Sequence, residues 1–431
     1  MIGLYATIFI LMFLLIFGAP VVFAVALSAI TYFVVTPGMW DMVAIYPMRL
    51  FSGMDSFVFL CIPLFVLAGE IMNASGMMND LVKFCQVMVG RFKGGLAHVN
   101  ILASMIFGGI TGSGLADVSA LGPIEIKLMK DDGYDPAFAA ALTACSAVQG
   151  PIIPPSIPFV IFASLTSTSI GALFMAGAIP GIMIGLSQML VVVYMSRKAG
   201  FPSSKEKSTT KEKITVIKAA FFALMMPIII LGGIISGIFT PTEASAVAVG
   251  YCFVVAKFYY KQISISDYKR ILVTTAKTTG SIFLIIGFAS VIGWVLAAEN
   301  IPAIISQAIE RNNISPYMLL FFVNIFFLFN GMWLSDAAQL VLFAPLFTPI
   351  FAAMGVSPIH FGCVMVVNVM ISMITPPYGA ALYLAALISK EPLVNVTKAA
   401  LPFIISSIVV LFLITYFPVF CMTLPKLMGL V

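Results

Sequence analysis

The stretch FGGITGSGLAD at residues 107–117 returns in altered form as FNGMWLSDAAQ at residues 329–339, 222 positions later. Phenylalanine, glycine, serine and alanine occupy the same four places in both copies. The same spacing relates residues outside these copies, including five prolines between residues 107 and 180 (Pro123, Pro136, Pro154, Pro155 and Pro180), each followed by another proline 222 residues on. The two halves of the chain therefore share one structural plan.

The composition is that of a membrane protein. Of the 431 residues, 61% are hydrophobic and 9% are charged, and the mean hydropathy is +1.12. Soluble domains carry about a quarter charged residues, whereas successive long apolar stretches suit helices that cross a bilayer core of about 30 Å. We expect Ile2–Phe17, which lacks a basic leader, to be a retained span. A two-fold repeat in such a chain predicts a transporter.

Basic residues gather in two loops and predict the orientation of the chain. One loop, residues 197–218, holds seven lysines and arginines, and the second holds Lys257, Lys261, Lys269 and Arg270. The positive-inside rule places both loops in the cytoplasm. Binding of nucleic acid or of anionic lipid is the alternative use of these charges, and we favour orientation. Neither loop is long enough to form a domain that could capture a substrate in water.

The sequence offers little material for enzyme chemistry. Its six cysteines are scattered without paired spacing, and its only histidines, His98 and His360, lie far apart. We therefore expect no disulfide framework, no transition metal, no organic cofactor and no enzymatic activity.

The charges and the parity of the crossings predict a topology. Residues 96–126 and 316–352 read as re-entrant helical hairpins, and residues 77–93 and 301–313 as amphipathic connectors in the membrane interface. Crossings are expected at 136–165, 170–196, 219–238, 242–256, 271–297, 358–388 and 398–421, with a cytoplasmic linker from Lys127 to Asp135 and ten crossings in all. Because five crossings separate equivalent points, the halves should be inverted relative to each other, with both termini outside.

This topology divides the chain into four parts, within an all-α polytopic fold of two inverted repeats. Residues 1–95 are expected to form scaffold helices and the first connector. Residues 96–196 form one half of a transport core, and residues 316–431 form the other. Residues 197–315 hold the basic loop, further scaffold helices and the second connector.

Each half also contains a proline-interrupted helix, read from Gly150-Pro-Ile-Ile-Pro-Pro-Ser156 and Ile374-Thr-Pro-Pro-Tyr-Gly379. Adjacent prolines leave carbonyls unpaired, which lipid does not tolerate. Those carbonyls are ligands for a hard cation such as Na⁺, and two shells would be completed by the hydroxyls and carboxylates of Ser113, Asp117, Ser335 and Asp336. The alternatives are helix caps at the serines, caps or ion pairs at the aspartates, and simple kinks at the prolines.

The free amides at the interrupted helices would face an anionic substrate. We expect the substrate contacts near them, at Thr111, Gly112, Ser156, Asn330 and Tyr378. Thr240-Pro-Thr-Glu243 has the spacing of a capping box, which explains Glu243 without a role in ion binding. No role is assigned to Glu70 or Glu125.

Four of these stretches, in order along the whole chain, resemble the large membrane subunit of tripartite ATP-independent periplasmic (TRAP) transporters: residues 107–117, 150–156, 237–244 and 375–379. The resemblance implies Na⁺-driven uptake of organic acids across the bacterial inner membrane by an elevator mechanism. It also implies two partners, a small four-helix membrane subunit and a secreted periplasmic substrate-binding protein.

The resemblance further implies two Na⁺ sites and a substrate class. One site would use Ser113, Asp117 and the backbone from Gly150 to Pro154, and the other Ser335, Asp336, Thr375 and the backbone near Gly379. Tyr378 departs from the small aliphatic residue of dicarboxylate-type members, which favours sialic acid over a C4-dicarboxylate. The alternatives left open are a stand-alone Na⁺/dicarboxylate or citrate carrier, an intramembrane hydrolase and a passive channel.

Overall fold

The computed structural model describes residues 2–199, 201, 210–377 and 379–431, and within them every regular element is a helix. The first half contains α1 (Ile2–Ile16), α2 (Val21–Val35), α3 (Ile45–Met54), α4 (Cys61–Ala74), α5 (Met77–Val89), α6 (Gly95–Thr111), α7 (Gly114–Asp131), α8 (Pro136–Ser146), α9 (Ile157–Thr166) and α10 (Ile170–Ala199). The second half contains α11 (Thr210–Ile235), α12 (Pro241–Val255), α13 (Ile265–Ala298), α14 (Ile301–Arg311), α15 (Pro316–Asn330), α16 (Asp336–Ala353), α17 (Pro358–Ser372), α18 (Ala380–Ser389), α19 (Leu393–Tyr416) and α20 (Val419–Leu427). The all-α membrane fold expected from the sequence is confirmed.

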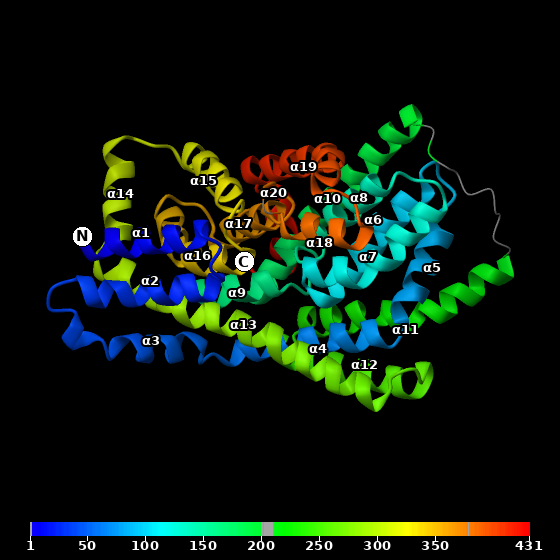
Figure 1. Ribbon diagram of the computed structural model, residues 1–431, viewed down its shortest axis with the longest axis horizontal. Coiled ribbons are helices and arrows are strands. Elements are labelled where there is room, and N and C mark those ends of the chain that lie inside the picture. The colour runs from blue at the N-terminus through cyan, green and yellow to red at the C-terminus, as the bar shows by residue number, and fades with distance from the viewer. Residues whose placement is uncertain (1, 200, 202–209, 378) are drawn as a thin grey trace.

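Among the described residues, six helices are long and apolar enough to cross a membrane, and eight shorter helices are also apolar. Most helices run along the long axis of the molecule (Figure 1). Large apolar side chains such as Phe9 and Leu190 are exposed on the outside, which suits contact with lipid.

Helix boundaries recur at the sequence spacing. α7 begins at Gly114 and α16 at Asp336, while α8 and α17 begin at Pro136 and Pro358, so both pairs of starts are 222 residues apart. Proline suits the first helical position because its missing N–H would be unpaired there anyway. The halves differ where α13 is continuous, since the matching segment of the first half is divided into α3 and α4.

Two helix–turn–helix units lie at the places expected for hairpins. α6 and α7 join through Gly112 and Ser113, and Gly112 has a φ of +61°, which glycine adopts without strain. Ser113 and Ser335 cap the second helix of their units, each accepting a 3.4 Å hydrogen bond from the amide three residues on. The Lys127-to-Asp135 linker is shorter than expected: α7 continues to Asp131 and ends before Gly133, where φ is +90°.

The predicted amphipathic connectors correspond to α5 and α14. In Figure 1 both run across the direction of most other helices, α5 near one end of the long axis and α14 near the other. One face of α5 is buried through Met77, Leu81 and Cys85, as its alternating sequence predicts.

The capping box at the start of α12 is present. The Thr240 N–H donates to Glu243 Oε2 over 2.8 Å, and the Glu243 N–H donates to Thr240 Oγ1 over 3.3 Å. Glu243 therefore stabilises the start of a helix.

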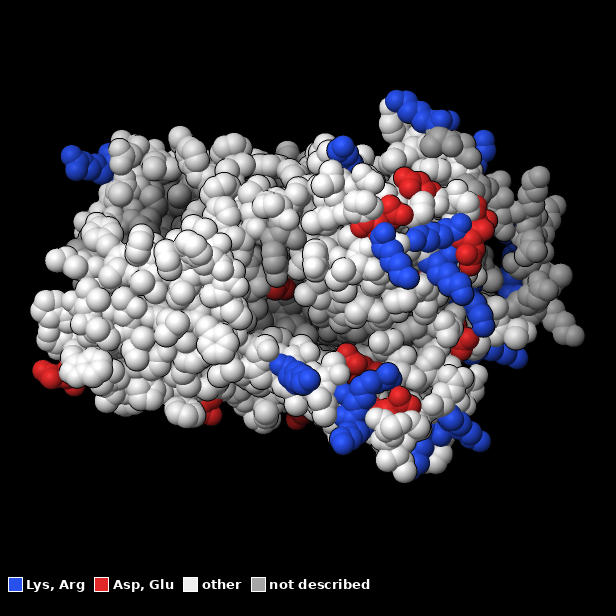
Figure 2. Space-filling view, viewed as in Figure 1, with Lys and Arg blue, Asp and Glu red and all other residues white. Residues whose placement is uncertain are grey.

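Charged side chains gather toward the end of the molecule that holds α5 and the beginning of α11, while most of the visible surface elsewhere is uncharged (Figure 2). α13 packs against α2, α3, α4 and α16, so it joins the first helices of the chain to the second hairpin.

Candidate functional site

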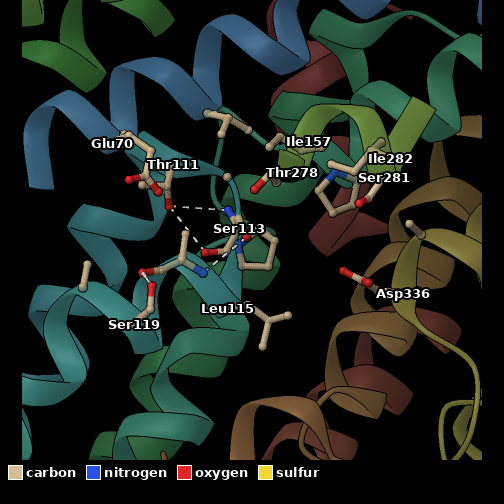
Figure 3. Close-up of a pocket in the computed structure, with 18 of the residues that line it drawn as sticks. Glu70, Thr111, Ser113, Leu115, Ser119, Ile157, Thr278, Ser281, Ile282 and Asp336 are labelled. Atoms are coloured by element: carbon tan, nitrogen blue, oxygen red, sulfur yellow. Dashed lines mark hydrogen bonds between the residues drawn. The ribbon is translucent and has the colours of Figure 1, made fainter. Parts of the chain in front are cut away.

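A cavity of about 410 Å³ lies where the tip of α6–α7 meets α4, α9, α13 and the start of α16. Thr111, Gly112 and Ser113 contribute the tip, and Asp336 contributes the start of α16. Figure 3 shows Glu70 beside Thr111, with Asp336 across the cavity from Ser113. The structure thus brings residues of both repeat copies to one space.

The tip of the first hairpin packs tightly onto the first interrupted helix. A Cβ added to Gly150 would lie 2.7 Å from the Cα of Gly108, and one added to Gly112 would lie 2.9 Å from the amide nitrogen of Ile157. Only glycine permits such backbone contact. Thr111, Gly112 and Ser113 are therefore held against residues 150–156, as the sequence predicts.

The first interruption lies between the end of the short η3 helix (Ala147–Gln149) and the start of α9. Ser156 caps α9 by accepting a 3.2 Å hydrogen bond from the Phe159 amide, and its hydroxyl donates to the Pro151 carbonyl. The Pro154–Pro155 peptide is cis. Ser156 is buried as a cap and does not line the cavity, whereas Pro151 does.

Asp117 lies in the first turn of α7 and is 1% exposed. Neither of its carboxylate oxygens makes a hydrogen bond with a described residue, although Ser104 is nearby. From Ser104 a buried polar chain runs through Ser146 at 3.0 Å to Asn100, which accepts a 2.8 Å bond from Ser146. A buried carboxylate without a partner is costly, so this position calls for a cation or a proton.

The second hairpin places its acid differently. Asp336 is the first residue of α16 and faces the cavity. The position 222 residues after Asp117 is Gln339, whose Nε2 donates a 3.1 Å hydrogen bond to Ser372 at the end of α17. The two aspartates are therefore not counterparts, and the expectation of matched carboxylates at equivalent tips is corrected.

The second interruption separates α17 from α18. The Ala381 amide reaches across it to the Met373 carbonyl over 3.2 Å, and the Pro376–Pro377 peptide is cis. Thr375 Oγ1 donates to the Ile371 carbonyl over 3.0 Å, and Gly379 precedes α18 with a φ of +38°. Tyr378 lies outside the described residues.

Asn330 uses its side-chain amide within α15, where it donates to the Phe326 carbonyl over 2.9 Å. The predicted residues therefore fall into two groups. Those that line the cavity are Thr111, Gly112, Ser113 and Asp336. Those that lie outside its lining are Asp117, Gly150, Pro154, Ser156, Asn330, Ser335, Thr375 and Gly379.

Five polar residues of α4 and α13 line the cavity without having been predicted: Glu70, Asn73, Thr274, Thr278 and Ser281. The sequence does contain a signal for the last three, because hydroxyls at positions i, i+4 and i+7 form a polar stripe on one face of an apolar helix. In a membrane helix such a stripe should face a cavity.

The charge of the cavity is one-sided. Glu70 and Asp336 are the acids among its described lining residues, and none of those residues is a lysine, arginine or histidine. Electrostatics therefore favour a cation in this space.

The sequence matches the family described as "Tripartite ATP-independent periplasmic transporter, DctM component" over residues 8–420. This chain belongs to the DctM family. It is a multi-pass protein of the bacterial inner membrane and a transporter permease subunit, not an enzyme.

Several DctM-family relatives are similar over nearly their whole length. The sialic acid TRAP transporter large permease protein SiaM of Vibrio cholerae is 37% identical over 96% of both chains. The C4-dicarboxylate TRAP transporter large permease protein DctM of Pseudomonas aeruginosa is also 37% identical, over 94% of this chain and 93% of its own. The 2,3-diketo-L-gulonate TRAP transporter large permease protein YiaN of Escherichia coli is 34% identical over 90% of this chain and 91% of its own.

Solved structures of the YdaH transporter of Alcanivorax borkumensis and of MtrF of Neisseria gonorrhoeae share the fold. Their TM-scores are 0.63 and 0.58, at 14% and 13% identity. The YdaH match covers 89% of this chain and 90% of YdaH, and the MtrF match covers 87% of this chain and 84% of MtrF.

Proposed function

We propose that this DctM-family subunit imports a carboxylate-bearing organic acid together with Na⁺. The observation that carries the proposal is the cavity of about 410 Å³, in which Glu70 and Asp336 face hydroxyls and no described lining residue is basic. An anion enters such a space only when cations compensate the acids. Oxygen ligands from carboxylates, hydroxyls and backbone carbonyls suit a hard cation.

The first Na⁺ site would lie at the tip of α6–α7. Ser113, Asp117 and the backbone of Gly150–Pro154 are the ligands proposed for it. Support comes from the tight packing of this tip on the interruption and from the unpaired carboxylate of Asp117. The polar chain from Ser104 to Asn100 holds the helices behind Asp117 in place.

The second Na⁺ site would lie at the tip of α15–α16, with Asp336 as its acid. Ser335, Thr375 and the backbone near Gly379 are its further proposed ligands. Gln339 and Ser372 tie this hairpin to α17 through their 3.1 Å hydrogen bond. A neutral amide therefore occupies the place that Asp117 holds in the first half.

We infer an elevator mechanism built from two inverted repeats. The recurring helix starts and the crosswise helices α5 and α14 at opposite ends support this arrangement. The two hairpins and interrupted helices would form the moving core, within residues 96–196 and 316–431, against a scaffold that contributes Glu70 and the hydroxyl stripe of α13.

Sialic acid is the proposed substrate, with a C4-dicarboxylate next. SiaM and the Pseudomonas DctM protein are equally identical to this chain, so their names support both substrates. Delivery would come from a periplasmic substrate-binding protein, and a small membrane subunit would complete the transporter. The names of the relatives, which are large permease proteins of TRAP transporters, support this division.

The test is uptake into proteoliposomes that contain this chain, the small subunit and the binding protein. Sialic acid should accumulate only with an inward Na⁺ gradient, and a negative interior should increase the uptake. Each net charge moved inward gains about 2.3 kcal/mol per 100 mV, so two Na⁺ with a monoanion are driven by voltage as well. Accumulation that ignores Na⁺ would remove the ion sites, and uptake by this chain alone would favour a stand-alone carrier.

A further inference from the structure

A second cavity, of about 570 Å³, lies away from the first, between the ends of α5 and α10 and the start of α6. Its wall is apolar, with Phe92, Leu186 and Leu190 among its lining residues. Lys93 and Arg197 also line it. Both basic residues are exposed, and neither forms an ion pair with a described residue.

The apolar wall and the basic residues follow one helix face. Leu186, Leu190, Val193 and Arg197 are spaced i, i+4, i+7 and i+11 along α10. At 1.5 Å per residue the stripe is about 16 Å long, close to half of the roughly 30 Å hydrocarbon core. An apolar track as long as one leaflet thus ends at a cationic group.

The position of the basic end fits a headgroup. Arg197 opens the lysine-rich loop that the positive-inside rule places in the cytoplasm. Leu190 is 70% exposed and Phe92 is 61% exposed, so the wall is open to lipid.

An unpaired polar atom adds an independent observation. His98 lines the cavity and is 5% exposed, yet its Nε2 has no hydrogen bond partner among the described residues. A buried nitrogen of this kind is stabilised by a ligand oxygen that reaches it. The ester and glycerol oxygens of a phospholipid lie between its headgroup and its acyl chains, as His98 lies beside both Lys93 and the apolar wall.

We propose that this cavity is a binding site for an anionic phospholipid of the cytoplasmic leaflet. Lys93 and Arg197 hold the headgroup phosphate, one acyl chain lies along Leu186 and Leu190, and His98 meets an oxygen between them. This assigns the first residues of the basic stretch a ligand in addition to their orienting role. The site is independent of the Na⁺ and substrate sites.

Quenching of tryptophan fluorescence by brominated lipids tests the proposal on the full chain in nanodiscs. Leu190→Trp places a reporter in the cavity, and Val409→Trp places one on exposed α19, with the parent signal from the native tryptophans subtracted. Brominated phosphatidylglycerol should bind at position 190 about thirtyfold more strongly than brominated phosphatidylcholine, since each basic residue near the surface contributes about 1 kcal/mol. At position 409 the two lipids should quench about equally.

Charge-neutral variants provide the matched comparison. Lys93→Gln with Arg197→Gln should bring the preference at position 190 down to that at position 409. Lys213→Gln with Lys218→Gln removes the same charge from α11 and should leave the preference intact. Equal quenching by both lipids in the parent, or a preference that survives loss of Lys93 and Arg197, would overturn the proposal.

Two further arms separate other occupants of the cavity. Inorganic phosphate in the buffer should leave the quenching unchanged; if it abolishes the preference, the cavity is a site for free anions. The measurement is repeated with the small membrane subunit bound. Loss of quenching by both lipids there would make the cavity a protein interface and rule out the lipid.

Discussion

Gly69 on α4 touches Thr111 at the tip of the first hairpin: a Cβ added to Gly69 would lie 3.4 Å from the Cβ of Thr111 and 2.7 Å from its Cγ2. This contact joins the proposed scaffold to the proposed moving core. If the core moves as an elevator, the two residues must separate in every transport cycle.

A disulfide at this contact should therefore stop transport. Cβ atoms joined by a disulfide lie about 3.5–4.5 Å apart, so Gly69→Cys with Thr111→Cys can form the bond with little movement. We expect no uptake when the pair is oxidised and recovery of uptake on reduction. Thr111→Cys alone is the control, and the six native cysteines are all buried. Full uptake by the cross-linked protein would exclude movement at this contact.

Asp117 and Glu125 allow ion binding to be separated from simple burial. Both lie on α7, are nearly inaccessible and have carboxylates without hydrogen bonds to described residues. A ligand present at a hundred times its Kd stabilises the protein by about 2.7 kcal/mol. Asp117→Asn should raise Tm in Na⁺-free buffer, because a neutral amide is less costly to bury, and should reduce the Na⁺-dependent rise in Tm.

Glu125→Gln is the matched control for that measurement. It should also raise Tm without Na⁺ but keep the full Na⁺-dependent rise. If the two variants respond to Na⁺ alike, Asp117 is not a ligand.

The hydroxyl stripe of α13 should contact the substrate. Thr278→Val with Ser281→Ala removes two hydroxyls from the cavity, and we expect a higher KM for uptake with an unchanged Na⁺-dependent rise in Tm. Each lost hydrogen bond corresponds to about 1 kcal/mol, or roughly fivefold in affinity.

Thr275 and Thr279 lie on the buried side of the same helix, where their hydroxyls have no described partner. Valine at these two positions should leave KM unchanged, because neither lines the cavity. An equal rise in KM from both pairs would point to a general effect on α13.

Gly150→Ala should destabilise the protein and lower uptake. The added methyl group would lie 2.7 Å from the Cα of Gly108, a backbone atom that cannot turn aside. Overpacking of this kind costs about 1–3 kcal/mol. Gly280→Ala, in the middle of α13, meets no atom within 4 Å and should stabilise its helix by up to about 1 kcal/mol. Thermal unfolding of the two variants in detergent compares them, and equal Tm values would contradict the packing.

Much of the fold was accessible from the sequence because glycine, proline and serine have strong local effects. The hairpin turn at Gly112 and Ser113 and the caps at Ser156 and Ser335 follow from residue type alone. The constant spacing also pairs Asp117 with Gln339, so the unequal chemistry of the two tips is already present in the sequence.

The cavity was less accessible, since its walls come from distant segments. Glu70 faces Thr111 only because α4 packs on the hairpin tip, which no local pattern reveals. The lack of a partner for Asp117 likewise depends on how α6, α7 and α8 pack together.

The one-sided charge of the cavity sets the order of events in the proposed cycle. An organic anion that reaches the empty space is repelled by Glu70 and Asp336, so sodium has to arrive before it. A carrier loaded in that sequence cannot let its cargo slip back out unaccompanied, and the cell keeps what it has concentrated.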